Sequence, residues 1–164
     1  YGYELEVNSS PWYLKIEAKG KGGETPYTRA FEEAESVELT APEFDSELKF
    51  LKWSDGDLNR VKVVEMNGPK KVTAIYGAKR TITSYPPGLV VRINAETHST
   101  PVVLYPPVGQ YLRLEPKPKE NNEILEFSHW KEYPEKERVT TILVRRSQLT
   151  YTAVYKGITD AVPI

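Results

Sequence analysis

Phe50-Leu51-Lys52-Trp53-Ser54-Asp55-Gly56 is followed further along the chain by Val72-Thr73-Ala74-Ile75-Tyr76, and both segments return in related form. The second occurrences are Phe127-Ser128-His129-Trp130 and Tyr151-Thr152-Ala153-Val154-Tyr155. Self-similarity at a long period is the sequence signature of a repeated structural unit. The chain is therefore predicted to contain two copies of one module, residues 1–78 and 79–157, with residues 158–164 as a C-terminal tail or linker.

The repeated segments also supply the large side chains expected inside each module. We predict a core that includes Phe50, Trp53, Ala74 and Tyr76 in the first copy and Phe127, Trp130, Ala153 and Tyr155 in the second. Phe50 and Trp53 lie three positions apart, so in a regular strand their side chains would point to opposite faces. Either a β-bulge re-aims the tryptophan, or the strand ends and Trp53 folds over the edge of the core.

Apolar residues occupy alternate positions from Trp12 to Ala18, which is the period of a half-buried strand. A shift of 77 residues superposes Trp12 on Leu89 and keeps the alternation through Ala95. We therefore expect Trp12 and Leu89 to be core residues at equivalent positions.

The pattern as a whole predicts an all-β fold of two tandem small β-sandwich-like modules, with β-grasp-like α+β modules as the alternative. Residues 31–35 are compatible with one helical turn, whereas the prolines in residues 106–109 are not. Because the copies should share a fold, both segments are interpreted as irregular loops. Residues 20–24 and 96–99 are also expected to be loops.

Composition narrows the function classes. The formal net charge of −1 provides no strong field for nucleic acid, and the lack of cysteine excludes disulfides and thiolate metal sites. No apolar run is long enough for membrane insertion by a helix. Abundant Lys and Glu, with two glutamines and one methionine, favour a thermophilic prokaryote. A start at Tyr1 is expected of a processed protein or of a piece excised from a larger one.

Catalytic apparatus is not visible in the sequence. His98 and His129 have no spacing that would pair them as metal ligands or as an acid and a base, and no nucleophile elbow or phosphate-binding glycine loop occurs. We therefore predict a protein that is not an enzyme.

Asp55, Asp57 and Asn59 place oxygen ligands at alternate positions, as at the start of a calcium loop. The glutamate that completes such a loop is absent, because the twelfth position is Met66. A turn that uses Asp and Gly for their backbone geometry is the favoured interpretation, and calcium is the one cofactor left possible.

A set of tyrosines expected to be exposed suggests a second function, that of a carbohydrate-binding module with a possible glycan partner. Because the set is not repeated between the copies, this remains the alternative to a structural role. Its members are Tyr13, Tyr27, Tyr105, Tyr111 and Tyr133.

The order of these features resembles the divergent internalin-type B-repeat domains of bacterial proteins. The features are the proline turns, the Thr-Pro pairs at Thr25 and Thr100, the Phe-x-x-Trp segments and the closing Thr-Ala-Ile-Tyr. The resemblance implies an extracellular or cell-surface location and a non-catalytic role as a spacer, stalk or adhesive module. Its partners would be other domains of the same parent protein or neighbouring surface proteins. The second copy departs from the pattern after its tryptophan, where Lys131-Glu132-Tyr133 replaces Ser-Asp-Gly.

A third possibility is a subunit of a self-assembling extracellular filament. In that case Tyr1–Val7 is expected to be an extended strand donated to the open sheet edge of a neighbour.

Overall fold

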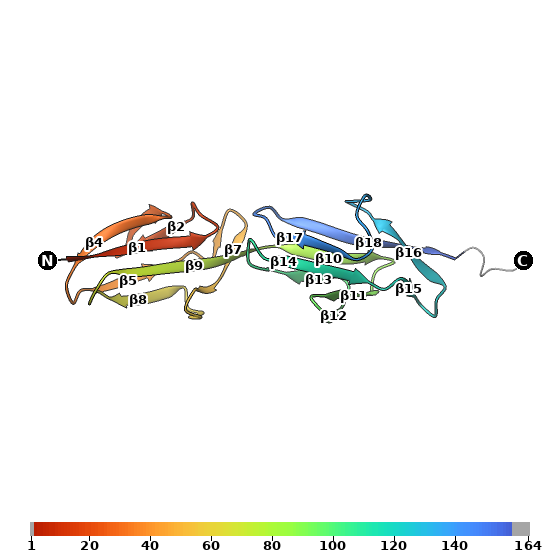
Figure 1. Ribbon diagram of the computed structural model, residues 1–164, viewed down its shortest axis with the longest axis horizontal. Helices are drawn as coiled ribbons and strands as arrows, with labels where there is room; N and C mark the ends of the chain where they lie inside the picture. The colour runs from red at the N-terminus through yellow and green to blue at the C-terminus, as the bar shows by residue number, and fades with distance from the viewer. Residues whose placement is uncertain (1, 159–164) are drawn as a thin grey trace, which may run out of the picture. The chain divides into compact units, whose positions relative to one another are not determined.

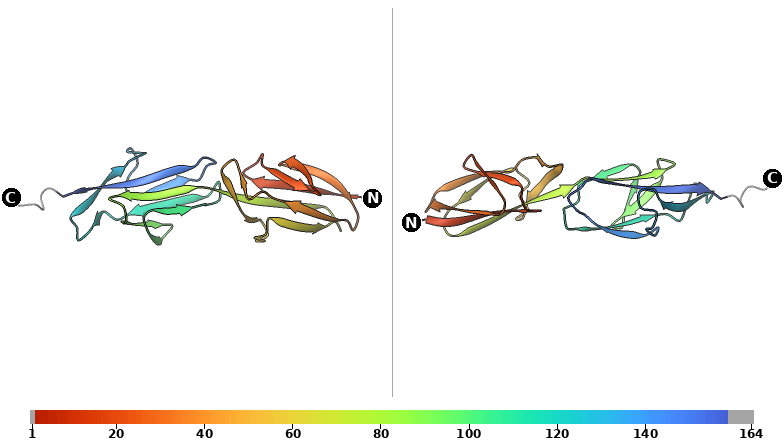
Figure 2. Two further views of the ribbon diagram at one scale, coloured as in Figure 1. Left: turned by 180° about the vertical axis from the view of Figure 1, so that it is seen from behind. Right: turned by 90° about the horizontal axis from the view of Figure 1, so that it is seen from above.

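The computed structural model describes residues 2–158, and every regular element in that range is a β-strand (Figure 1). Two further views of these residues again show strands and connecting loops only (Figure 2). The all-β prediction is confirmed, and the β-grasp alternative is wrong because it needs a helix. It follows that no helix within residues 2–158 could cross a membrane. The chain forms two compact units, residues 2–78 with 107–109, and residues 79–106 with 110–158.

The first module consists of a five-stranded sheet in the order β4-β1-β9-β7-β6 and a four-stranded sheet in the order β3-β2-β5-β8. The strands of the larger sheet are β1 (Gly2–Ser10), β4 (Tyr27–Glu32), β6 (Phe44–Asp45), β7 (Leu48–Trp53) and β9 (Lys70–Ala78). Those of the smaller sheet are β2 (Lys15–Ala18), β3 (Lys21–Glu24), β5 (Ser36–Thr40) and β8 (Val61–Glu65).

The second module has the same topology. Its five-stranded sheet has the order β13-β10-β18-β16-β15, and its four-stranded sheet has the order β12-β11-β14-β17. The strands of the larger sheet are β10 (Arg80–Tyr85), β13 (Val102–Leu104), β15 (Lys119–Glu120), β16 (Leu125–Trp130) and β18 (Leu149–Gly157). Those of the smaller sheet are β11 (Val90–Ile93), β12 (Glu96–Ser99), β14 (Tyr111–Pro116) and β17 (Thr140–Leu143). The prediction of two tandem β-modules is therefore confirmed.

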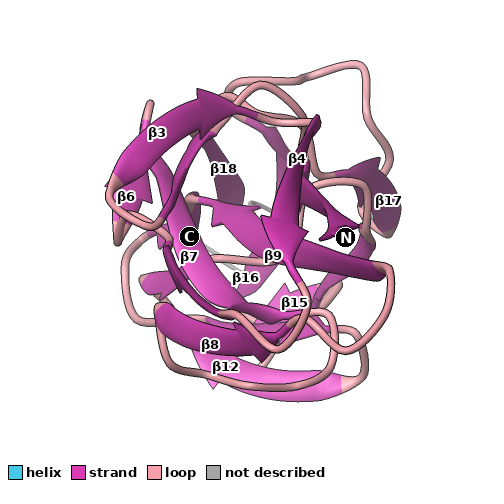
Figure 3. Ribbon diagram, turned by 90° about the vertical axis from the view of Figure 1, so that its left-hand side faces the viewer, coloured by secondary structure: helices cyan, strands magenta, loops and turns pink. Residues whose placement is uncertain are grey.

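Alternating burial shows that each sheet covers an interior with one face. Leu5 and Val7 of β1 are fully buried, as are Ile16 of β2 and Leu39 of β5, while their neighbours on each strand are more exposed. In Figure 3 the strands of the first module curl around this shared interior. The inward residues of both sheets thus form one sandwich core.

The predicted equivalence of Trp12 and Leu89 was wrong by two residues. Thr25 donates its backbone N–H to the carbonyl of Leu14, and Thr100 donates to that of Leu89, both at 2.9 Å. Leu89 is therefore equivalent to Leu14, and the shift is 75 residues. A slip of two residues preserves the alternation of faces, so the apolar pattern could not reveal it.

The core assignments of Trp12 and Leu89 need correction as well. Trp12 is 55% exposed and Leu89 only half-buried. Tyr13 has a φ of 70°, outside the extended region, so the alternation of β2 does not reach back to Trp12. The regular strand begins only at Lys15.

A β-bulge lets Phe50 and Trp53, three residues apart on β7, point to the same side of the sheet. The register of β7 against β9 shifts between Phe50, which faces Tyr76, and Lys52, and Trp53 then faces Ala74. The bulge turns both aromatic side chains of β7 to the same side of the sheet. In the second module the register of β16 against β18 shifts in the same way between Phe127 and His129.

The bulge creates an aromatic cluster at the centre of the first module. The ring of Phe50 meets those of Trp53 and Tyr76 edge to face, at centroid separations of 5.7 and 5.6 Å. The indole N–H of Trp53 donates to the carbonyl of Asn59 at 2.7 Å, and the Tyr76 hydroxyl donates to that of Pro42 at 2.6 Å. Burial raises the pKa of Tyr76, in keeping with a neutral phenol inside the core.

The second module repeats this cluster. Phe127 meets Trp130 and Tyr155 at 5.8 Å each, and the Trp130 indole donates to the carbonyl of Glu137 at 2.8 Å. Trp130 and Tyr155 are buried, as are the small residues Ala74 and Ala153 on the matching strands. Phe127 is only half-buried, so its assignment to the core holds less completely than that of Phe50.

Several segments expected to be loops are strands instead. Residues 21–24 form β3, residues 96–99 form β12, and Phe31 and Glu32 belong to the end of β4. β3, β12 and β4 lie at sheet edges, and β3 contains two glycines, so the usual sequence signals for strands are weak there.

The strand-donation hypothesis is also wrong for residues 2–7. They belong to β1, which pairs antiparallel with β4 and parallel with β9 of the same module. Residues 2–7 pair with β4 on one side, and β9 covers the other side from Leu5 onward, so this segment is an integral strand of its own module. Tyr1 lies outside the described residues.

Replacing Trp53 with Ala should lower the free energy of unfolding by about 3–5 kcal/mol, because a large buried ring is lost and its cavity persists. Replacing Trp12 with Ala should change it by less than about 0.5 kcal/mol, as at other exposed sites. Denaturant melts of the two variants measure both values. Equal losses would contradict the opposite burial of the two indoles.

Candidate functional site

The five tyrosines proposed as a sugar platform are divided between the two modules, and each module exposes one of them. Tyr13 and Tyr111 are 63% and 62% exposed, but they belong to different modules. Tyr27, Tyr105 and Tyr133 are half-buried. Neither module therefore forms a row of exposed rings from this set.

Two of the half-buried tyrosines have structural contacts. The Tyr27 hydroxyl donates to the carbonyl of Ile16 at 2.6 Å, and the Arg29 guanidinium lies 4.6 Å from the centre of its ring. Tyr133 stacks on Tyr151 with centroids 4.7 Å apart. These contacts within the protein explain the positions of both tyrosine rings, and no ligand is needed to explain them.

The Asp55 turn is organised around a lysine. The ammonium group of Lys62 hydrogen-bonds Asp55 and lies 3.6 Å from a carboxylate oxygen of Asp57. The hydrogen bond from Lys62 lowers the pKa of the Asp55 carboxyl. Backbone N–H groups of Asp57 and Asn59 donate to the preceding aspartates, at 2.9 and 3.0 Å. The two carboxylates thus converge on Lys62, and residues 2–158 contain no cluster of three acidic or histidine side chains arranged to hold a metal.

The histidines lie in different sheets of the second module. His98 on β12 is 4.0 Å from Glu96, and His129 on β16 contacts the hydroxyl of Ser128 at 2.9 Å. They therefore do not form an acid–base pair with each other.

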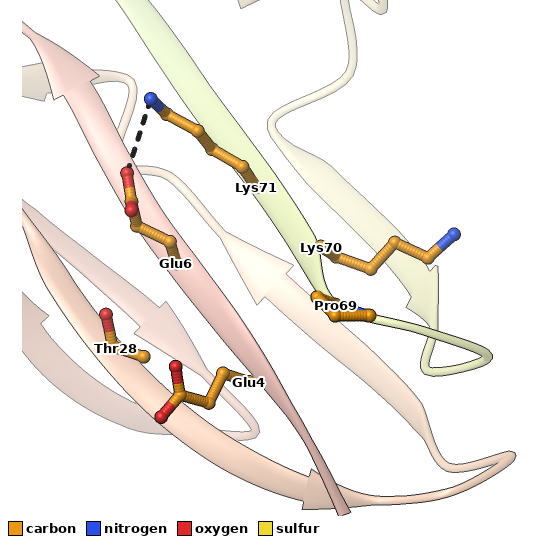
Figure 4. Close-up of a pocket in the computed structure, with 6 residues that line it drawn as sticks. All are labelled: Glu4, Glu6, Thr28, Pro69, Lys70 and Lys71. Atoms are coloured by element: carbon orange, nitrogen blue, oxygen red, sulfur yellow. Dashed lines mark ion pairs between the residues drawn. The ribbon is translucent and has the colours of Figure 1, made fainter.

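A shallow depression of about 260 Å³ lies on the outer face of the larger sheet of the first module (Figure 4). It is lined by Glu4, Glu6, Thr28, Pro69, Lys70 and Lys71. Lys71 reaches across from β9 to Glu6 on β1, with 3.5 Å between the ammonium nitrogen and the carboxylate oxygen, whereas Lys70 points away (Figure 4). Both members of this ion pair are exposed, as expected of a solvated sheet face.

A groove of about 410 Å³ lies beside β2 of the same module, and a smaller hollow of about 250 Å³ adjoins it. The two share Lys15 and Gly22. Figure 3 shows β3 and β6, which contribute to the groove, next to one another. The groove is lined by Lys15, Glu17, Gly22, Thr40, Pro42, Phe44 and Asp45.

The aromatic ring in this groove is Phe44, which is 53% exposed on the short edge strand β6. Next to it, Asp45 accepts a hydrogen bond from the backbone N–H of Lys15 at 3.1 Å, which fixes β6 against β2. The arrangement combines an open ring with carboxylates and an ammonium group, and it has the composition of a site for a small polar ligand with an apolar face.

Sequence reasoning did not identify Phe44 or this groove. The signal available was Gly22-Gly23, since glycine is unfavourable in a strand and often marks a close approach. The predicted loop at residues 20–24 concealed that signal, because glycine in a loop needs no explanation.

A buried arginine was also missed. Arg80 is fully buried at the position equivalent to Leu5, since both open the parallel pairing with the last strand of their module. Its guanidinium donates to the carbonyls of Lys79, Ser147 and Arg145, at 3.0, 2.6 and 3.1 Å. Burial lowers its pKa. Arg80 therefore fastens the loop before β18 to the start of β10.

Comparisons with known proteins do not identify a family for this chain. No family model matches the chain, and no curated protein matches it. Among solved structures the chain is similar to GBS52, the minor pilin of the Gram-positive pathogen Streptococcus agalactiae. The identity is 9%, the match covers 99% of this chain and 98% of that one, and the TM-score is 0.38. A TM-score of this size does not establish a shared fold.

Replacing Arg80 with Leu, the residue of the first module, should destabilise the second module by about 1–3 kcal/mol, because carbonyl acceptors lose their donors. Arg92→Leu on the exposed face of β11 is the matched control and should stay within about 0.5 kcal/mol of the parent. Urea unfolding followed by circular dichroism measures both. An Arg80→Leu variant as stable as the parent would mean that the guanidinium does not hold the loop.

Proposed function

We propose that the chain is a non-catalytic pair of structural β-modules, a spacer or adhesive part of a secreted or cell-surface protein of the internalin B-repeat type. The observation that supports this most is the parallel pairing of the first and last strands in each module. In the first module β1 and β9 pair in parallel from Leu5 opposite Lys70 to Ser10 opposite Ile75.

Parallel pairing of terminal strands has a mechanical consequence. The chain enters the module at the start of β1 and leaves at the end of β9, and β1 and β9 run in the same direction (Figure 1). These two points therefore lie at opposite ends of the strand pair. Tension along the chain loads the hydrogen bonds between the strands in shear, so that they must break together instead of one after another.

The second module is built in the same way. β10 and β18 pair in parallel from Arg80 opposite Leu149 to Tyr85 opposite Val154. Each module therefore conducts tension through its own pair of central strands, a property suited to a spacer or stalk. The resemblance to B-repeat domains supports an extracellular location, with other domains of the parent protein or neighbouring surface proteins as partners.

Force spectroscopy tests this role, and the lack of native cysteine allows attachment points to be chosen freely. Pulling between cysteines at Glu4 and Lys79 shears β1 against β9. Pulling between cysteines at Glu4 and Lys70 opens the same pair from one end, because Leu5 lies opposite Lys70. We expect a several-fold higher unfolding force in the first geometry. Equal forces in the two geometries would contradict the proposed role.

A further inference from the structure

The groove lined by Phe44, Lys15, Glu17 and Asp45 on the first module is not required by the fold, and it has the chemistry of a ligand site. We propose that it binds a pyranose unit of a polysaccharide. The inference adds a recognition function to the structural role and does not depend on it, because the strands that bear tension and the residues that line the groove are different.

The groove matches the two chemical surfaces of a pyranose. The sugar ring has a face of C–H groups, which packs on an aromatic ring, and Phe44 and Pro42 provide apolar surface in the lining of the groove. The hydroxyl rim needs acceptors and donors. Glu17 and Asp45 offer carboxylate oxygens, and Lys15 and Thr40 offer donors.

The two glycines of β3 differ in what a side chain at their position would meet. A Cβ on Gly23 would lie 2.7 Å from the ring of Tyr27, so Gly23 is required by packing. A Cβ on Gly22 would meet nothing closer than the Cγ of Glu17 at 3.9 Å. Packing therefore does not require glycine at position 22, and the missing side chain leaves the groove open.

The second module shows that the fold tolerates other residues at these positions. Gly22 lies opposite Glu17, as Thr97 lies opposite Arg92, and β15 starts with Lys119 where β6 starts with Phe44. The same topology thus forms without the glycine and without the ring. Their presence in the first module needs an explanation other than folding.

A saccharide fits this position better than a peptide strand does. Peptides that bind by adding a strand need a free sheet edge. Two edge strands border the groove, but β6 has only two residues and β3 contributes only Gly22. Side chains of β2, β5 and β6 form most of the lining, so recognition there depends on side chains more than on backbone pairing.

The test uses the whole chain with suspensions of cellulose, chitin, mannan and amylose and with a glycan array. Oligosaccharides of the retained polymer are then titrated by calorimetry. We expect binding to at least one of these probes. Phe44→Ala should weaken it about tenfold, as expected for loss of an aromatic contact. Gly22→Thr, which installs the residue of the second module, should abolish it while leaving the melting temperature unchanged.

Two controls locate the site. Trp12→Ala removes an exposed ring outside the groove, and Val63→Thr removes an exposed apolar side chain on β8. Both should bind as the parent does. The proposal would be overturned if the chain bound none of the probes. It would also be overturned if binding persisted in the groove variants but was lost with Trp12→Ala. Capture of a peptide that Gly22→Thr blocks and no saccharide displaces would overturn the saccharide assignment. The shear experiment is independent of all these outcomes.

Discussion

Each module depends on one irregularity, the β-bulge that turns an indole into the core. Without it, Phe50 and Trp53 would lie on opposite faces of β7, and one large ring would be left in water. With it, both rings lie on the same side of the sheet, and Phe50 meets Trp53 and also Tyr76 of the neighbouring strand edge to face. Because a buried indole N–H needs an acceptor, the ring also fixes the path of the following segment through the carbonyl of Asn59. Core packing and loop conformation are thereby coupled in a single side chain.

A pair of buried hydroxyl groups, separate from the bulge, links the two sheets of each sandwich. Ser9 on β1 hydrogen-bonds the hydroxyl of Thr25, which follows β3 of the other sheet, and Ser84 and Thr100 form the same contact in the second module. A buried hydroxyl without a partner is costly, so a pair of this kind favours one alignment of the sheets. The Thr25-Pro26 and Thr100-Pro101 segments seen in the sequence are thus sites where the sheets are joined.

The sequence predicted the features that carry large side chains and missed those that depend on backbone or small residues. The matched rings of Trp53 and Trp130 correctly indicated two modules with aromatic cores. The predicted alignment of β2 with its counterpart β11 was wrong because a shift of two residues keeps inward-facing positions inward-facing. β3 was missed because Gly22-Gly23 does not look like a strand. The groove was missed because Phe44 and Lys15 are distant in sequence and lie in different sheets, which meet only in the folded module.

Where equivalent positions of the two modules carry different residues, the burial of those residues indicates whether the difference serves the fold or a function. Leu5 and Arg80 differ chemically, yet both are fully buried, and the arginine is held by backbone carbonyls, so this difference belongs to the fold. Phe44 and Lys119 differ at an exposed edge, where neither is needed for the topology. An exposed aromatic ring at a position where the fold accepts a lysine is not explained by stability. The presence of Phe44 beside Gly22 is therefore better explained by contact with another molecule than by folding.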